Sequence, residues 1–223
     1  MRRNTLPRPD DPGSVDSKNI PSSTGKAPTE TVQPGTGYRM AFNFNAALFK
    51  VLVEHLKPEE EETVLDMGCS RGFYVKAMEN YTRGVIGVDI SEDSLENAVT
   101  PRVEYGDITN LNFTEGSFEK VYSLHTIEHL PDLERFFSEV TRVLKPGGTA
   151  IVIYPWELFR GMQAIGAAIR QYRNPLLARK LHLHRLTPKS IRRLIAGTSL
   201  THRQSRLVFA TGIQYMTILT KRT

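Results

Sequence analysis

Short apolar runs alternate with stretches of helical periodicity between residues 63 and 155. Because such alternation builds a parallel sheet covered by helices on both faces, the order predicts an α/β, Rossmann-like doubly wound sheet. The periodicity favours helices at 71–80, 91–98 and 133–144. The expected buried strands are "TVLDM" (63–67), "GVIGVDI" (84–90), "RVEYGD" (102–107), "FEKVYSLH" (118–125) and "TAIVIYP" (149–155).

The chain after Pro155 changes pattern. One helix is expected at 157–172, and Thr187-Pro188 is typical of a helix N-cap followed by proline at its first position. Two strands, 202–210 and 213–221, are expected to form a closing antiparallel pair. The sheet should therefore have about seven mostly parallel strands with the last one antiparallel, and residues 156–197 should form a helical insertion after strand five.

The N-terminal region differs from the rest in composition. Residues 1–37 contain many prolines separated by Ser, Thr and Gly and few apolar residues, so we expect a disordered arm. Residues 38–223 are then expected to form one domain, beginning with a helix at 43–56.

Other bulk features bear on location. The single cysteine, Cys69, excludes an internal disulfide framework. The sequence contains no run of 18 apolar residues, so we expect no membrane span. Arg2 and Arg3 are not followed by the apolar stretch of a secretory signal, so we expect a cytoplasmic protein.

The charge is distributed unevenly. From Trp156 to Thr223 there are 13 Lys and Arg residues and one acid, Glu157, although the whole chain carries only +5. This asymmetry indicates either an anionic partner for the C-terminal third or a basic surface that simply faces water.

The stretch "VLDMGCSRGFY", residues 64–74, joins the first strand to the next helix. It does not fit the dinucleotide fingerprint G-x-G-x-x-G, because Ser70 and Phe73 stand at the second and third glycine positions. No Gly-Lys-Ser/Thr follows, which excludes a P-loop. Asp66 at the strand end would repel a pyrophosphate but attract a cation. S-adenosylmethionine carries a sulfonium and an ammonium and no phosphate, so it suits this loop.

On these residues the chain resembles class I S-adenosylmethionine-dependent methyltransferases, of the broad type 11 group that includes quinone-biosynthesis enzymes. The family's acid-x-Gly-x-Gly-x-Gly loop stands here as residues 66–72, with Ser70 replacing the middle glycine. The acid that ends strand two is Asp89, the "GDI" triplet is 106–108, and "RVLKPGG" (142–148) resembles the stretch before strand five.

The resemblance implies roles for particular residues. Asp89 should accept hydrogen bonds from both ribose hydroxyls, Asp107 should meet the adenine amino group, and Ile108 should line the ring. The full expected cofactor-binding set is Asp66, Gly68, Cys69, Ser70, Gly72, Asp89, Ile90, Asp107, Ile108 and Leu124.

The resemblance also places the methyl acceptor beyond strand four, at "SLHTIEHL" (123–130). His125 would stand at the carboxyl end of that strand, and an imidazole suits proton removal from a phenol or enol. His125 is therefore the predicted catalytic residue; the alternative is that it only contacts the cofactor or packs the loop.

Some relatives of this group, in ubiquinone synthesis and at small-RNA ends, carry Glu-x-x-Glu-His as metal ligands. Here the pattern reads His125-x-x-Glu128-His129, with His182 or His184 as a later histidine. Because the first acid is missing, the pattern favours a structural role, and no metal ligand is assigned.

In the family that the chain resembles, the segment between strand five and the last two strands often forms a lid over the methyl acceptor, and we expect the same here. Its apolar positions Leu158, Met162, Ile165, Ile169 and Tyr172 recur at helical spacing, flanked by arginines. Such a segment fits an ordinary lid helix or peripheral contact with an anionic membrane. We expect methyl transfer to a small, apolar or lipidic acceptor, with O-, N- and C-methylation all open. The alternatives are an RNA methyltransferase that holds phosphates with its basic third, although nucleic acid is the less favoured partner, and a non-catalytic cofactor-binding subunit of another methyltransferase.

Overall fold

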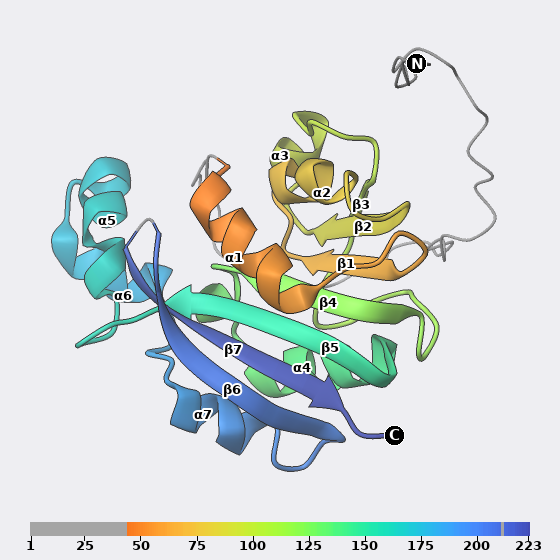
Figure 1. The fold of residues 1–223 in the computed structure, drawn as a ribbon. Coiled ribbons are helices and arrows are strands. Elements are labelled where there is room, and N and C mark those ends of the chain that lie inside the picture. Colours follow the sequence, from red (N-terminus) through yellow and green to blue (C-terminus); the bar gives the residue numbers. More distant parts are fainter. Residues whose placement is uncertain (1–43, 211) are drawn as a thin grey trace, which may run out of the picture.

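A computed structural model describes residues 44–210 and 212–223. The expected disordered arm, residues 1–37, and the first residues of the expected domain lie outside this part of the chain. The described residues form a seven-stranded sheet in the order β3-β2-β1-β4-β5-β7-β6 (Figure 1). The strands are β1 (Thr63–Met67), β2 (Gly84–Asp89), β3 (Val103–Tyr105), β4 (Phe118–Leu124), β5 (Leu144–Pro155), β6 (Leu200–Phe209) and β7 (Ile213–Lys221).

The sheet has the predicted mixed direction. Strands β1 to β5 pair in parallel, whereas β7 runs antiparallel to both β5 and β6. The order reverses between β1 and β4, so the carboxyl ends of these two strands open a crevice where α/β proteins bind ligands. This confirms the predicted fold class.

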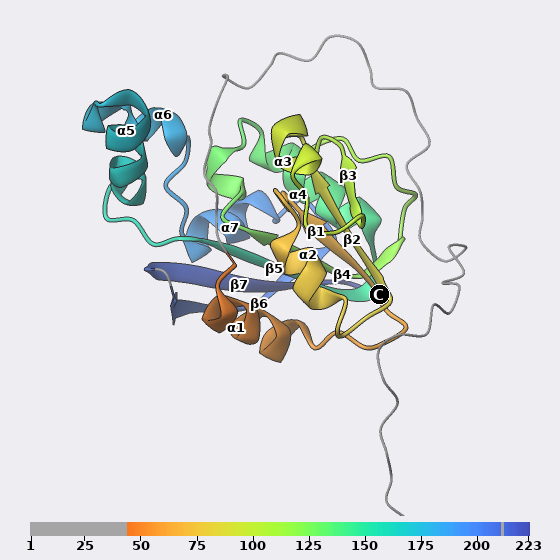
Figure 2. The same cartoon turned by 90° about the horizontal axis from the view of Figure 1, so that it is seen from above.

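Helices cover both faces of the sheet (Figure 2). Side chains alternate between the faces along each strand: Val64 packs with α1 and α2, and Leu65 packs with α4 and α7. The helices are α1 (Ala46–Leu56), α2 (Phe73–Met78), α3 (Glu92–Glu96), α4 (Leu133–Val143), α5 (Ile165–Tyr172), α6 (Ala178–Leu181) and α7 (Pro188–Leu194), with short 3-10 turns η2 (Ile127–His129), η3 (Met162–Ala164) and η4 (Pro175–Leu177).

Several predicted helix starts are confirmed by their caps. Ser91 accepts a hydrogen bond from the backbone of Ser94 at 3.2 Å and opens α3. Thr187 and Ser190 form a reciprocal capping box at α7, with Pro188 in the first turn. Both caps satisfy backbone N–H groups that the helix itself leaves unpaired.

The predicted helix at 157–172 was wrong in its first half. The regular helix begins only at Ile165, because Gly161 adopts a left-handed φ of 84° and Glu157 turns back over the chain. The Glu157 carboxylate accepts hydrogen bonds from the backbone N–H groups of Gly161 and Gln163, both at 3.0 Å.

Smaller differences concern element ends. β5 starts at Leu144 rather than at 149, so the Lys-Pro-Gly-Gly stretch lies within it, at a shift in its register with β4. β3 ends at Tyr105, because the Asp107 carboxylate accepts bonds from the backbone and hydroxyl of Thr109 and forms a turn. α2 starts at Phe73, after Gly72 at a φ of 75°.

Candidate active site

The loop between β1 and α2 is held close to its neighbours. The backbone N–H groups of Gly68 and Cys69 both donate to Val88 O of β2, at 2.8 and 3.1 Å. Gly68 has a φ of 89°, and a Cβ there would overlap the Thr126 side chain. Only glycine allows both this conformation and this approach. Ser70, in place of the family's middle glycine, adopts a left-handed φ of 49°.

A pocket opens at the carboxyl ends of β1 and β4. Six of the predicted residues line it together with four others: Asn45, Leu48, Asp66, Gly68, Cys69, Ser70, Phe73, Tyr74, Leu124 and His125. Gly68 of the loop, Asp66 of strand one and His125 after strand four therefore meet in one place.

Asp66 is the acidic group of this pocket. Its side chain is buried, and this burial raises the pKa of Asp66 well above its usual range, with the Tyr122 hydroxyl offsetting only part of the effect. A cation bound beside this carboxyl group would offset the cost of ionising it, whereas a phosphate would add to that cost.

Asp89 is connected to the pocket by a hydrogen bond with the loop. Its Oδ2 accepts a hydrogen bond from Ser70 N at 2.7 Å, and its Oδ1 accepts one from Ser91 N at 2.9 Å. A carboxylate oxygen has a second lone pair, so both oxygens can still accept from a ribose while they order the loop.

The remaining predicted cofactor residues lie beside the pocket rather than in its wall. Ile90 is exposed at the end of β2, whereas Ile108 is buried in the core. Asp107 is engaged with Thr109, and Gly72 packs near Val103 of β3. Their contacts with adenine stay a prediction.

Cys69 lines the pocket but is not suited to nucleophilic chemistry. Burial, together with the charges of Asp66 and Asp89, raises the pKa of the Cys69 thiol far above its usual range. The nucleophilic form of cysteine is the thiolate, so this side chain acts here as a small apolar contact.

His125 is held in an uncommon backbone conformation. Its φ is 53°, and its N–H donates to Ile153 O of β5 at 2.8 Å. The ring Nδ1 lies 3.6 Å from Glu128 Oε1, and the side chain keeps about an eighth of its surface exposed. Positive φ at a residue other than glycine costs energy and often marks a functional site.

These features fit S-adenosylmethionine better than a nucleotide phosphate. The glycine loop allows close backbone approach, Asp66 suits the ammonium and sulfonium charges, and Asp89 offers acceptors for a ribose. The pocket residues Asn45, Leu48, Phe73 and Tyr74 all have uncharged side chains.

Comparison with known proteins agrees with this fit. Residues 65–152 match a family described as a methyltransferase domain. The geranyl diphosphate C-methyltransferase of Streptomyces coelicolor, solved with Mg²⁺, geranyl diphosphate and S-adenosyl-L-homocysteine, superimposes with a TM-score of 0.61 at 20% identity, over 80% of each chain. The chain carries a class I S-adenosylmethionine-dependent methyltransferase domain. The cofactor of this domain is S-adenosylmethionine.

Curated relatives of the methyltransferase domain include lipid-modifying enzymes. A sterol 24-C-methyltransferase from Pneumocystis carinii is 33% identical over 46% of this chain and 30% of its own length. A ubiquinone biosynthesis O-methyltransferase from Mesorhizobium japonicum is 25% identical over 71% of this chain and 66% of its own length. The chain thus spans about a third of the sterol enzyme and just under two thirds of the ubiquinone enzyme.

Four pocket residues of the methyltransferase domain were missed by the sequence analysis: Asn45, Leu48, Phe73 and Tyr74. Asn45 caps α1 and its N–H donates to the Tyr74 hydroxyl at 3.2 Å, which joins α1 to α2 over the pocket. The only sequence signal was the position of Phe73 and Tyr74 directly after the glycine loop.

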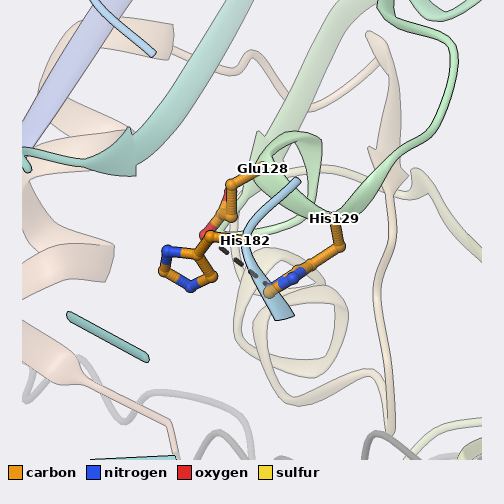
Figure 3. A group of neighbouring side chains, drawn as sticks. All are labelled: Glu128, His129 and His182. Atoms are coloured by element: carbon orange, nitrogen blue, oxygen red, sulfur yellow. Dashed lines mark ion pairs between the residues drawn. The ribbon is translucent and has the colours of Figure 1, made fainter. Parts of the chain in front are cut away.

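A group of buried and partly buried polar side chains lies next to His125. Glu128, His129 and His182 converge there from η2 and from the segment after α6 (Figure 3). Burial alone would raise the pKa of Glu128, but the imidazoles of His125, His129 and His182 outweigh it and lower the pKa. Burial lowers the pKa of His129 despite the nearby Glu128 charge.

The lid segment exposes apolar side chains that were expected to pack on one helical face. Its own small core consists of Ala164, Ala168, Ala178 and Leu181 instead. The three alanines let α5 and α6 approach closely, and several of the longer side chains point outward. Large apolar residues are therefore exposed there: Leu158, Phe159, Ile169, Tyr172 and Leu176.

Proposed function

We propose that this chain transfers the methyl group of S-adenosylmethionine to a small lipidic acceptor. The observation that carries the proposal is the combination of a cation-suited cofactor pocket with a lid that exposes large apolar side chains. Relatives named for sterols and ubiquinone support the same class of acceptor.

Two carboxylates of the chain would position the cofactor. Asp66 would balance the positive charge of the cofactor, and Asp89 would hold the ribose and the loop at Ser70 together. When bound, S-adenosylmethionine supplies a methyl group already activated by its sulfonium, so that positioning accounts for most of the protein's contribution.

His125 would act on the methyl acceptor. It lines the pocket at the end of β4, and the hydrogen bond from its backbone N–H to Ile153 O holds the His125 backbone in position. For a hydroxyl acceptor, the imidazole would take the proton as the acceptor oxygen bonds to the methyl carbon and the carbon–sulfur bond breaks. Glu128, 3.6 Å from Nδ1, would orient the ring.

The lid would bring the protein to the acceptor's membrane. Leu176 is 81% exposed and Leu158 65% exposed, and the exposed Arg160, Arg170 and Arg179 lie in the same segment. Gln163 donates to Ile213 O at 2.7 Å, which connects the lid to the β6–β7 end, where Phe209 is 72% exposed. No helix among residues 44–210 and 212–223 is long and apolar enough to cross a bilayer. Apolar anchors with basic neighbours suit an anionic interface.

Flotation with vesicles tests this surface. The wild-type protein should float with phosphatidylserine-containing vesicles and less with neutral ones. The double variant Leu158→Asp/Leu176→Asp should bind at least about tenfold more weakly, because each lost leucine anchor is worth about 1.5–3 kcal/mol when fully buried.

Tyr81→Ser is a matched control, since Tyr81 is also an exposed apolar residue but lies between α2 and β2 at the opposite edge of the sheet. It should float like the wild type. A wild-type protein that stays in the soluble fraction with both vesicle types would count against membrane contact.

A further inference from the structure

The cluster next to His125 has the composition of a metal site. One ligand atom from each of Glu128, His129 and His182 lies within 4.8 Å of the others. Glu128 and His129 come from η2, and His182 follows α6, so the fold brings together residues more than fifty positions apart (Figure 3). The sequence did not favour a metal site, because the first acid of the Glu-x-x-Glu-His pattern is missing, and it left open whether His182 or His184 joins the pair.

The Glu128 carboxylate is the residue that most needs a partner. Its side chain is 1% exposed, and Oε2 is buried without a hydrogen-bond partner among the described residues. A buried carboxylate oxygen with an unfilled acceptor position is costly. A cation placed between Glu128 and the two imidazoles would remove that cost.

Both histidines are oriented through Nδ1. His129 Nδ1 lies 2.7 Å from Leu181 O, and His182 Nδ1 lies 2.8 Å from the Glu157 carboxylate. Metal-binding imidazoles are commonly held in this way, by a carbonyl or carboxylate on one nitrogen while the other binds the ion. Nε2 is then the ligand atom of each ring, and His129 Nε2 lies 3.9 Å from Glu128 Oε1.

The charges also suit a divalent ion. Glu128 and Glu157 are both buried acids, at 1% and 4% exposure. One divalent cation would balance the two carboxylates while His129 and His182 stay neutral, which is the form that binds metals.

We propose that Glu128, His129 and His182 bind one divalent transition-metal ion of the zinc type, with Glu157 as the outer carboxylate that orients His182. Two imidazoles and one carboxylate are ligands that zinc accepts, at about 2.0–2.2 Å, so binding would draw the three side chains slightly inward. Three protein ligands leave a fourth position for water or a substrate atom. The site shares Glu128 with the proposed orientation of His125, but its metal affinity is measured without methyl transfer.

Zinc titration of the chelator-treated full chain tests the site directly. The wild type should bind about one Zn²⁺ per chain and should unfold at a higher temperature when loaded. Glu128→Gln and His182→Asn should lose this ion. Glu157→Gln should keep it with an affinity about 10–100-fold lower, as expected for an outer partner.

His184→Asn is the matched control. His184 lies two positions from His182, but its Nε2 contacts Leu130 O and it is not part of the cluster. It should retain the wild-type affinity. Co²⁺ added to the wild type should give the visible spectrum of a tetrahedral site, which needs no variant to fold. Absence of Zn²⁺ binding by the wild type, or wild-type affinity in folded Glu128→Gln and His182→Asn, would overturn the proposal.

Discussion

Replacing Asp89 by alanine is expected to weaken S-adenosylmethionine binding by roughly 100-fold or more. The change removes the acceptors for Ser70 N and Ser91 N and those proposed for the ribose. Hydrogen bonds to a charged group are worth about 1.5–3 kcal/mol each, and about 1.4 kcal/mol corresponds to tenfold, so two lost ribose bonds account for this effect. Isothermal titration with the cofactor measures it.

The control for this change is Glu92→Ala. Glu92 is an exposed acid in the first turn of α3, three positions along the chain, and has no assigned contact with the cofactor. Its removal alters the net charge equally but should leave affinity as in the wild type. A folded Asp89→Ala protein that binds S-adenosylmethionine normally would contradict the assigned cofactor site.

Replacing His125 by alanine is expected to lower the methyl-transfer rate by about 10²–10⁴-fold, the usual contribution of a general base. The affinity for S-adenosylmethionine should change little, because His125 faces the acceptor in our account. Single-turnover transfer and cofactor titration, made on the same preparation, separate the two quantities.

His55→Ala serves as the control for His125. His55 lies on α1 with its Nδ1 2.9 Å from Val51 O, and it does not line the pocket. It should transfer methyl groups at the wild-type rate. If His125→Ala lost cofactor affinity and rate together, His125 would be a cofactor contact and not the base.

Local patterns predicted most of the sheet and the glycine loop. β1 has the predicted bounds because a short apolar run followed by a glycine turn is a local signal. The loop conformation followed in the same way from Gly68 and Gly72. These features depend on neighbouring residues alone, so the sequence shows them directly.

Features that depend on distant contacts could not be predicted. The contact of Asn45 with Tyr74 closes the pocket from a helix 29 positions away. The break at Gly161 is a nearer case: it depends on the Glu157 carboxylate, only four positions away, which has no helix-ending pattern of its own. Which of His182 and His184 meets Glu128 and His129 depends on how α6 packs. The exposure of Leu158 and Leu176 depends on the alanines that fill the lid.

The most direct test of the central claim uses methyl-labelled S-adenosylmethionine, the purified protein and a cell extract. After the reaction, the label is separated into an organic phase and a nuclease-sensitive precipitate, with Asp89→Ala protein as the blank. The account predicts label in the organic phase with the wild type and much less with the blank. Label in the nuclease-sensitive precipitate would instead make the basic lid a phosphate-binding surface and the acceptor an RNA, which would contradict the lipidic acceptor.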